Sequence, residues 1–446
     1  PREAVRATPD PMQPLRLLAA LVAVAALGPV PCLAVGIVVP LVPDDNSLET
    51  AISNGAALNS SLQNLNPGDE LVVGRENETV YVMGGLYAED IDSVVLRFEG
   101  TLRFSDHIRQ WPRSSDDKVL NCIKIVDARN ITFTSTTRAT LDGNGRRWWG
   151  FPGVGYLVRE ENRPKLIDID SSSNVLVENL LLKNSPYYTF LASNVDGLEV
   201  RWTDIDARRT DLDEHDVLDM TAFNTDGFDV TGKNVWIHDC NVWNQDDCIA
   251  VKDGSENMLF ERINASGVGL TIGSISGSVV RNITFRDCYM HHTYKGIYMK
   301  FRDGSSPGSI TDVTYENIVI DEPSQWAIWI GPAQQSDSRR LCAAHPCSIC
   351  WPEVPSAECN APAAGTYANI TLRNITVIRP KTSPGVLRAN ASNPMQNIVF
   401  DGVQVIDPGD KPWGDAYYDC ENVQGVATGN TWPVPPCFDD QTNRES

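Results

Sequence analysis

Two short acidic runs hold the residues with the clearest chemical potential in this chain of 446 residues. They are Asn224-Thr-Asp-Gly-Phe-Asp229 and Gln245-Asp-Asp-Cys248, whose first aspartates, Asp226 and Asp246, lie 20 residues apart. Asp247 adds a third carboxyl to the second run. Carboxylates that are held close together repel one another, so one of them tends to keep its proton near neutral pH. A carboxylic acid beside a carboxylate is the pair of groups that acid/base cleavage of a glycosidic bond requires.

A repeating strand pattern indicates how these two runs meet. From about residue 128 to residue 405 the sequence repeats an Asn, alternating apolar residues and a closing Asp or Asn, as in Asn234-Val-Trp-Ile, Asn257-Met-Leu-Phe and Asn282-Ile-Thr-Phe. Each unit joins β-branched residues to turn-forming residues, and helical periodicity is nearly absent. A β-sandwich also fits strands at this spacing, but the regular Asn and the unit length favour a solenoid. We therefore predict an all-β fold, a single-stranded parallel β-helix in which neighbouring strands lie about 4.8 Å apart.

The N-terminal part of the chain divides into two segments. Residues 1–34 are expected to hold upstream residues and a secretory signal peptide, because Arg16 precedes the apolar run Leu17–Leu27 and Cys32-Leu-Ala34 resembles a cleavage site. A membrane anchor is the alternative, but the apolar run is short for a bilayer. Residues 35–127 are less periodic, and we expect a cap and the first turns there, since a solenoid must cover its open end.

The rest of the chain is expected to form the β-helix catalytic domain, residues 128–410, with a cysteine-rich loop at 339–362, followed by a C-terminal tail, residues 411–446. Four cysteines between Cys342 and Cys359 have the spacing of a zinc knuckle, but in an exported chain a disulfide-stapled loop is the preferred interpretation. Cys420 and Cys437 are candidates to close a second loop, and the connectivity is left open.

Composition narrows the partners of the protein. A formal net charge of −21 argues against nucleic acid, but it allows an acidic polysaccharide if a local basic patch faces the substrate. We expect a secreted, extracellular monomer that is not inserted in a membrane once its signal is removed. Eight N-x-[ST] sequons fit export. We expect no cofactor and no metal.

Several motifs resemble those of the polygalacturonase-type enzymes, glycoside hydrolase family 28. The resemblance covers most of residues 90–405, and the two acidic runs, in this order and spacing, are its most specific part. The other matching segments are Leu141-Asp-Gly-Asn-Gly145, Trp148-Trp149, Arg163-Pro164 and Asn184-Ser-Pro186. The resemblance implies a right-handed parallel β-helix that cleaves pectin backbones with inversion. It implies that Asp246 is the general acid and that Asp226 and Asp247 activate the attacking water.

The same resemblance implies a substrate-binding set of Lys300, Tyr298, Asn224 and Gln245. Tyr298 stands where the family has an arginine, in Tyr298-Met-Lys300, and a tyrosine cannot bind a carboxylate with two parallel hydrogen bonds. Val268 stands where the family has a histidine, in Gly267-Val-Gly-Leu-Thr-Ile-Gly-Ser274, and a valine cannot hydrogen-bond to the aspartates.

The assignment makes two geometric demands. Adjacent residues on a strand point to opposite faces, so Asp246 and Asp247 can share one cleft only if a bulge or bend interrupts the strand through Gln245–Cys248. Inversion also requires carboxyl groups roughly 6.5–9.5 Å apart, and Asp226 and Asp246 on adjacent turns are expected at the lower part of that range. Asp229 is interpreted as a turn or strand-end residue.

Four functions remain open at this point. The first is hydrolysis of homogalacturonan, and the second is hydrolysis of rhamnogalacturonan or another modified pectin, because of the changes at Val268 and Tyr298. The third is a catalytically inactive carbohydrate-binding β-helix, against which the intact aspartates argue. The fourth is a lyase acting by β-elimination, which the three carboxyl groups suit less well than protonation of a leaving oxygen.

Overall fold

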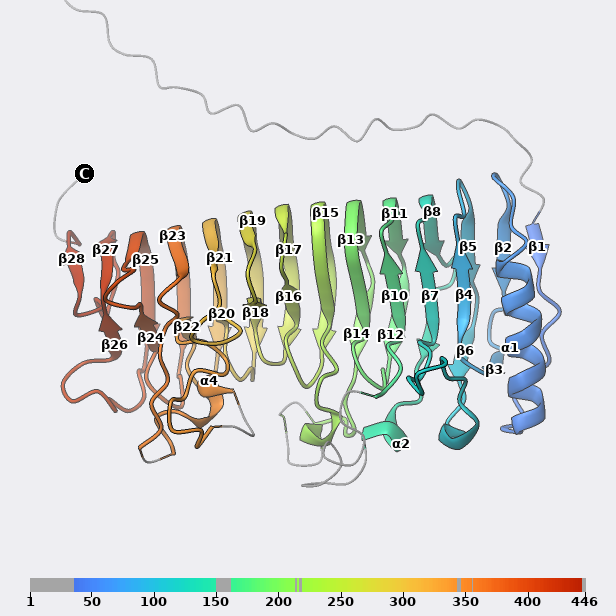
Figure 1. Ribbon diagram of the computed structural model, residues 1–446, viewed down its shortest axis with the longest axis horizontal. Coiled ribbons are helices and arrows are strands. Elements are labelled where there is room, and N and C mark those ends of the chain that lie inside the picture. Colours follow the sequence, from blue (N-terminus) through green and yellow to red (C-terminus); the bar gives the residue numbers. More distant parts are fainter. Residues whose placement is uncertain are drawn as a thin grey trace, which may run out of the picture. The chain divides into compact units, whose positions relative to one another are not determined.

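The computed structural model of the protein describes residues 36–149, 162–212, 215, 219–342, 346–354 and 356–442 (Figure 1). These residues coil into a right-handed parallel β-helix, which confirms the predicted fold class. All 28 strands belong to one continuous sheet, and the ladders between the named strands are parallel. The expected secretory signal lies outside the described residues.

The strands stack in three columns along the coil. The first column contains β13 and β15 through their N-terminal ends together with the following short strands: β4 (Leu86–Glu89), β7 (Ile123–Val126), β10 (Ile167–Asp170), β16 (Ile249–Val251), β18 (Leu270–Ile275), β20 (Ile297–Phe301), β22 (Ile328–Gly331), β24 (Gly385–Arg388) and β26 (Tyr418–Glu421).

The second column holds most of the long strands. Its members are β1 (Gly36–Val38), β2 (Glu70–Val73), β5 (Val95–Phe98), β8 (Arg129–Thr134), β11 (Ser173–Glu178), β13 (Phe190–Arg201), β15 (Phe228–Trp243), β17 (Glu256–Ser266), β19 (Val279–His291), β21 (Gly308–Asp321), β23 (Gly365–Ile378), β25 (Met395–Ile406), β27 (Val423–Thr428) and β28 (Phe438–Asp440).

The third column continues into the C-terminal ends of the long strands. Its separate members are β3 (Thr79–Val82), β6 (Thr101–Phe104), β9 (Ala139–Asp142), β12 (Leu180–Lys183) and β14 (Asp204–Asp206). The helical segments are α1 (Leu48–Leu62), α2 (Arg146–Trp149), α4 (Cys347–Cys350) and the 3-10 turns Ile108–Gln110 and Asp219–Ala222.

The repeated Asn of the sequence marks a backbone bend in many turns of the middle of the coil. The asparagines that begin these units have positive φ angles, between 52° and 58°, a conformation that Asn tolerates better than most residues; they are Asn130, Asn174, Asn234, Asn257, Asn282, Asn317, Asn369 and Asn397. Several also bond along the stack: Asn282 Nδ2 donates to Asn257 Oδ1 at 2.7 Å, and Asn397 Nδ2 donates to Asn369 Oδ1 at 2.9 Å. The repeat therefore encodes both the corner of each turn and a bond to the next turn.

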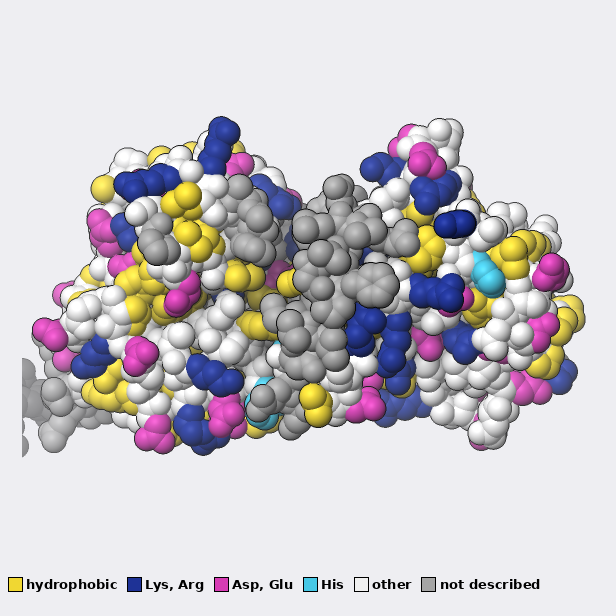
Figure 2. Space-filling model, turned by 90° about the horizontal axis from the view of Figure 1, so that it is seen from below, with side chains coloured by type: hydrophobic (Ala, Val, Ile, Leu, Met, Phe, Trp, Pro, Cys, Tyr) yellow, Lys and Arg dark blue, Asp and Glu magenta, His cyan; other side chains and the backbone are white. Residues whose placement is uncertain are grey.

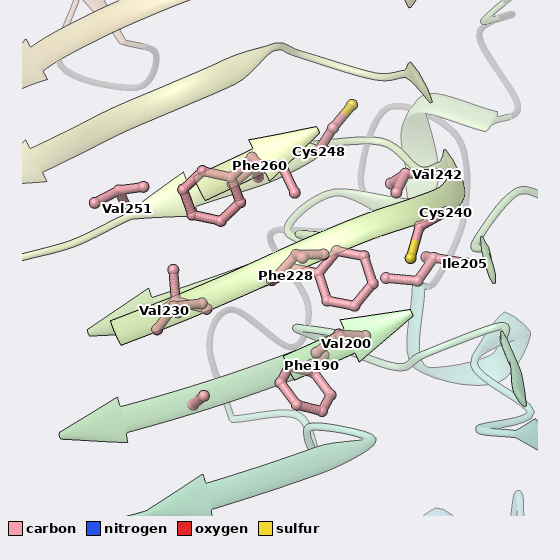
Figure 3. Close-up of a cluster of buried hydrophobic side chains, with 14 of the residues drawn as sticks. Phe190, Val200, Ile205, Phe228, Val230, Cys240, Val242, Cys248, Val251 and Phe260 are labelled. Carbon is pink, nitrogen blue, oxygen red and sulfur yellow. The ribbon is translucent and has the colours of Figure 1, made fainter. Parts of the chain in front are cut away.

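The interior of the coil is filled by the inward-pointing residues of each strand. Phe260 and Phe285 on adjacent turns stack with ring centroids 4.8 Å apart, and Phe285 stacks on Tyr315 at 4.6 Å. Figure 3 shows Phe190 and Phe228 packed in the same interior among smaller aliphatic side chains. Because each turn packs on its neighbours, the interior is one continuous apolar column.

The N-terminal end of the coil is covered by α1 (Figure 1). Ser47 caps this helix by accepting a hydrogen bond from the Thr50 amide at 3.1 Å. Its inner face buries Ala51, Leu58 and Leu62 against the first turns. Burial of these side chains shields the open edge of the core from water.

The coil is longer at both ends than the repeat in the sequence suggests. Strands β2 to β7, within residues 35–127, already stack in register with later turns. Strands β26 to β28 lie inside the segment 411–446 that was expected to be a tail, and they pair with β24, β25 and β27. The Asn-led pattern is absent from these end turns, so the sequence repeat marks only the middle of the solenoid.

The cysteine-rich loop is stapled by disulfides, as predicted. Cys342 pairs with Cys350 and Cys347 pairs with Cys359, while Cys420 pairs with Cys437. The four other described cysteines are buried and unpaired: Cys122, Cys240, Cys248 and Cys288. Among the described residues, no helix combines the length and apolarity needed to cross a bilayer.

A row of charged residues runs along the second column of strands, and its charges alternate in sign over most of its length. In register, its members are Glu178, Arg201, His238, Glu261, Arg286, Glu316, Arg373 and Asp401. Glu261 is its most buried member: its carboxylate accepts from Arg286 Nε at 2.6 Å and from Trp236 Nε1 at 3.0 Å, and its side chain is 3% exposed. Buried charge-assisted bonds of this kind cost more to remove than exposed ion pairs.

We predict that Glu261→Gln lowers the free energy of unfolding by about 1–3 kcal/mol, because it weakens buried bonds to Arg286 and Trp236. The matched control is Glu256→Gln on the same strand, whose exposed pair with Arg281 is worth about 0–1 kcal/mol. Thermal midpoints of the two variants measure the difference. Equal midpoints would show that the buried bonds of Glu261 contribute nothing beyond a surface pair.

Candidate active site

The register of the coil brings the two acidic runs together. Asp226 lies two residues before the start of β15, and Asp246 and Asp247 lie in the connection between β15 and β16. The Gly227 amide donates to Asp247 O at 2.8 Å, so the two runs sit on adjacent turns. Residues 244–248 form a bend and not a strand, which is the interruption that a shared cleft for Asp246 and Asp247 demands.

The three carboxyl groups form one cluster. One oxygen each from Asp226, Asp246 and Asp247 lies within 4.8 Å of the other two. Asp226 and Asp247 are almost completely buried, whereas Asp246 is only half-buried. Asp246 is therefore the member of the cluster that is most open to an incoming ligand.

Hydrogen bonds orient the cluster. Asn224 Nδ2 donates to Asp246 Oδ2 at 3.2 Å, and the Asp247 amide donates to Asp246 Oδ1 at 2.8 Å. Thr271 Oγ1 donates to Asp247 Oδ1 at 2.6 Å. Asp226 Oδ1 is buried and accepts no hydrogen bond from the described residues, so it can accept one from a ligand or a water molecule.

Burial and mutual repulsion change the proton affinity of the cluster. Burial and then the neighbouring charge of Asp247 raise the pKa of Asp246 to about 6, against a smaller lowering by Lys300. Burial, followed by the charges of Asp229 and Asp246, raises the pKa of Asp226 well above its usual range. The protons therefore belong to the cluster as a whole, and the site carries at least one carboxylic acid near neutral pH.

Two lysines balance the negative charge. Lys252 Nζ lies 2.9 Å from Asp229 Oδ1 and 3.8 Å from Asp226 Oδ2, and Lys300 Nζ lies 3.4 Å from Asp247 Oδ2. Burial alone would lower the pKa of Lys252, but the carboxylates of Asp229 and Asp226 raise it. The three clustered carboxyl oxygens have the chemistry to hold a cation, but these two ammonium groups already occupy that electrostatic role.

The structure places the four expected substrate-binding residues differently. Asn224 and Lys300 contact the carboxyl cluster directly, at Asp246 and Asp247. Gln245 turns its side-chain oxygen to His215 Nδ1 at 3.0 Å. Tyr298 is 2% exposed, and its hydroxyl hydrogen-bonds to Ser348 of the stapled loop, so the hydroxyl faces away from solvent.

Asp229 is a residue of the site that sequence reasoning missed. It was interpreted as a turn or strand-end residue outside the site; it is the second residue of β15, but it is fully buried and forms an ion pair with Lys252. In the register of the first column it is the outward-pointing neighbour of Ala250, which is followed by Thr271 and Tyr298 on later turns. The alternation of inward Phe228 and outward Asp229 was the signal in the sequence that could have revealed it.

Arg163 has a supporting role that the sequence did not specify. Its guanidinium donates to Asn224 Oδ1 at 3.0 Å and to the carbonyl oxygens of Pro186 and Phe223 at 3.0 and 2.8 Å. These bonds hold the side chain that in turn donates to Asp246. The segments Arg163-Pro164 and Asn184-Ser-Pro186 therefore serve the geometry of the cluster.

Figure 2 shows the face that carries α2, α4 and the loops between them. Lys and Arg side chains gather near the middle of this face, although the chain as a whole has a net charge of −21. A basic patch of this kind attracts anionic ligands despite the overall negative field.

A parallel β-helix with clustered aspartates on one face is the arrangement of a polysaccharide-processing protein. The family model of glycosyl hydrolases family 28 matches residues 70–354, more than half of the chain. The chain belongs to this family, as its sequence motifs predicted.

Several curated proteins are similar in sequence. An endopolygalacturonase of Emericella nidulans is 28% identical over 346 residues, which cover 76% of this chain and 79% of that protein. A probable endopolygalacturonase I of Aspergillus flavus is 33% identical over 234 residues, 51% of this chain and 58% of that protein. The match thus spans little more than half the length of the latter relative.

Solved structures share the fold. An endo-xylogalacturonan hydrolase of Aspergillus tubingensis superposes with a TM-score of 0.63 at 19% identity, covering 91% of this chain and 99% of the other. A polygalacturonase of Erwinia carotovora superposes with a TM-score of 0.62 at 22% identity, covering 86% and 95%. At these identities the likeness supports the β-helix alone.

We predict that Asp246→Asn stabilises the protein, and more so at pH 7 than at pH 4. The pKa of Asp246 is raised from 3.8 to about 6 on folding, so the folded state binds more protons and the free energy of unfolding falls as pH rises through that window. The uncharged amide of Asn does not titrate, so the variant lacks this fall in the free energy of unfolding. Thermal midpoints at the two pH values measure the effect, with the exposed Asp410→Asn as control. A stabilisation that is equal at both pH values would contradict the raised pKa.

Proposed function

We propose that the protein is a secreted hydrolase that cleaves α-glycosidic bonds in pectin, with polygalacturonase-type activity. The observation that carries the proposal is the cluster of Asp226, Asp246 and Asp247, whose carboxyl oxygens lie within 4.8 Å of one another. Membership of glycosyl hydrolases family 28 and similarity to endopolygalacturonases support the substrate class.

In the proposed mechanism Asp246 is the general acid. Its pKa of about 6 keeps it protonated in mildly acidic solution, and its half-exposed position gives it access to the leaving oxygen of the scissile bond. Protonation of that oxygen allows the bond to break as positive charge develops on the sugar ring. Asn224 keeps the carboxyl group in place through its bond to Asp246 Oδ2.

Asp226 and Asp247 are proposed to activate the attacking water together. Because the pKa of Asp226 is raised well above its usual range, Asp226 holds the water, and the Asp247 carboxylate, which is paired with Lys300, takes its proton. A water molecule with two hydrogen bonds of about 2.8 Å in tetrahedral geometry bridges oxygens about 4.6 Å apart, which fits the spacing of the cluster. Lys300 and Thr271 fix the carboxylate of Asp247. The unpaired Asp226 Oδ1 is a free acceptor for the water.

Inversion of configuration is part of the proposal and rests on the family resemblance. The nearest carboxyl oxygens are closer than the roughly 6.5–9.5 Å between carboxyl groups that is typical of inverting enzymes. The distance between nearest oxygens is shorter than the distance between group centres, to which that range refers. The anomeric form of the first product, followed by NMR, distinguishes inversion from retention.

Secretion, action as a monomer and absence of nucleic-acid binding complete the proposal. Disulfides in the described chain fit an oxidising compartment, and the net charge of −21 disfavours polyanions other than those drawn to the local basic patch.

We predict that the protein releases new reducing ends from pectic polymers without forming unsaturated uronides. Asp246→Asn should lower kcat by about 10²–10⁴-fold or more, because an amide cannot transfer the proton that the leaving oxygen needs. Far-ultraviolet circular dichroism confirms that the variant is folded, and Asp410→Asn on the surface is the matched control. Unsaturated products would establish a lyase, and full activity of the Asp246 variant would remove the proposed acid.

We also predict that kcat falls as pH rises past about 6, since Asp246 with a pKa of about 6 then loses the proton that it must donate. Initial rates across the range from pH 4 to pH 8 measure the profile. An activity that stays constant from pH 6 to pH 8 would exclude Asp246 as the acid.

A further inference from the structure

The two sides of the carboxyl cluster differ in charge along the coil. Backbone hydrogen bonds set the order of turns: Thr189 donates to Asp226 O, Gly227 donates to Asp247 O, and Val268 donates to Asp246 O. Tyr188 therefore lies one turn before the cluster and Val268 one turn after it. We call these the Tyr188 side and the Val268 side.

On the Tyr188 side, Lys165 is the cation that the carboxylates of the described residues leave unpaired. Its Nζ lies 5.8 Å from the centroid of the Tyr188 ring, whereas Lys252 Nζ lies 6.0 Å from the same centroid but is already paired with Asp229 and Asp226. Lys165 is half-buried and forms no ion pair with any carboxylate of the described residues. An ammonium group beside a half-exposed aromatic ring is suited to bind the carboxylate of a uronic acid whose ring packs on the tyrosine.

On the Val268 side, the lysines and the arginine of the described residues are already engaged. Lys300 is paired with Asp247, and its Nζ lies 4.0 Å from the centroid of the Tyr298 ring. Lys295 is fully buried and donates to Gln325 Oε1 at 2.7 Å. Arg388, further along, pairs with Asp419 at 3.2 Å and with Glu421 at 3.0 Å.

The surface of the Val268 side is apolar instead. Val268 packs against a cluster formed under the stapled loop by Tyr298, Trp326 and Trp329, with Trp351 and Trp413 at its edge. Trp351 and Trp413 are half-buried and stack with ring centroids 5.1 Å apart. The cation beside this surface, Arg388 over the Trp351 ring, is already paired with two carboxylates. A carboxylate placed here would lose water, and it would also face Asp246 and Asp247.

We propose that the cleft takes a uronate on the Tyr188 side and an uncharged sugar on the Val268 side. This inference rests on the proposed function and narrows its substrate to a pectin in which acidic and uncharged residues are neighbours. Two polymers have this chemistry: methyl-esterified galacturonan, and a chain of alternating galacturonate and rhamnose.

Binding to the folded but inactive Asp246→Asn protein tests the preference without depending on catalysis. The probes are a galacturonate oligomer, the same oligomer with part of its carboxylates methyl-esterified and an alternating galacturonate–rhamnose oligomer, titrated by calorimetry at fixed ionic strength. We expect one of the two mixed oligomers to bind at least about tenfold more tightly than the fully acidic one, equivalent to about 1.4 kcal/mol. The mixed oligomer that binds more tightly identifies the uncharged sugar as methyl-esterified galacturonate or as rhamnose. Equal or tighter binding of the acidic oligomer, or no binding of any probe, would overturn the inference.

Matched variants test which side of the carboxyl cluster causes the preference for mixed oligomers. Val268→Lys in the Asp246→Asn background adds a cation to the apolar side and should narrow the preference toward the acidic oligomer, whereas Val279→Lys on the exposed surface of β19 should leave it unchanged. Lys165→Met should weaken all three probes. Equal effects of the two valine variants would contradict the inference. Failure of the wild type to cleave any of the corresponding polymers would refute the proposed hydrolysis. The ranking of the oligomer affinities would still test the preference for a uronate on the Tyr188 side and an uncharged sugar on the Val268 side.

Discussion

Stacking of like residues in register is the constraint on which the rest of the molecule depends. In a parallel coil, residues one turn apart in the sequence must lie one strand spacing apart in space, about 4.8 Å. The coil therefore forces Asp226 against Asp246 and Asp247, although separated anions would be more stable. The continuous core of stacked apolar side chains and the asparagine bonds between turns supply the stability that offsets this repulsion. The crowding of the three carboxyl groups, and the raised proton affinity that follows from it, are thus consequences of the fold and not of any single neighbouring residue.

The lysines around the cluster show how the fold tolerates four buried carboxyl groups. Lys252 compensates Asp229 and Asp226, and Lys300 compensates Asp247, which leaves Asp246 without an ion pair of its own. Asp246 is also the member that is most exposed. The same distribution of counter-charges that makes the cluster possible singles out one carboxyl group to carry a mobile proton.

Sequence reasoning reached the fold class and the meeting of the three aspartates because both depend on period. The regular Asn and the length of the Asn-led units favour a coil over a sandwich, and in a coil that unit length places the acidic runs on adjacent turns. What the sequence did not reveal depends on side-chain direction or on loops. Asp229 was missed because the strand β15 begins earlier than its turn-like residues suggest. The burial of Tyr298 could not be predicted, because the stapled loop that covers it, and whose Ser348 bonds its hydroxyl, lies 50 residues further along the chain. Disulfide connectivity followed the path of that loop and could not be read from cysteine spacing.

The alternating row of charges along the second column of strands has a consequence for how such a coil can change in evolution. From Glu261 to Asp401 every turn presents the sign opposite to that of its neighbours. Loss or duplication of a single turn would set glutamate against glutamate or arginine against arginine, which opposes pairing. Loss or duplication of two consecutive turns would keep the pattern intact. This part of the protein can therefore lengthen or shorten most easily in pairs of turns. The favoured unit of insertion or deletion is two turns, although the structural repeat is one turn.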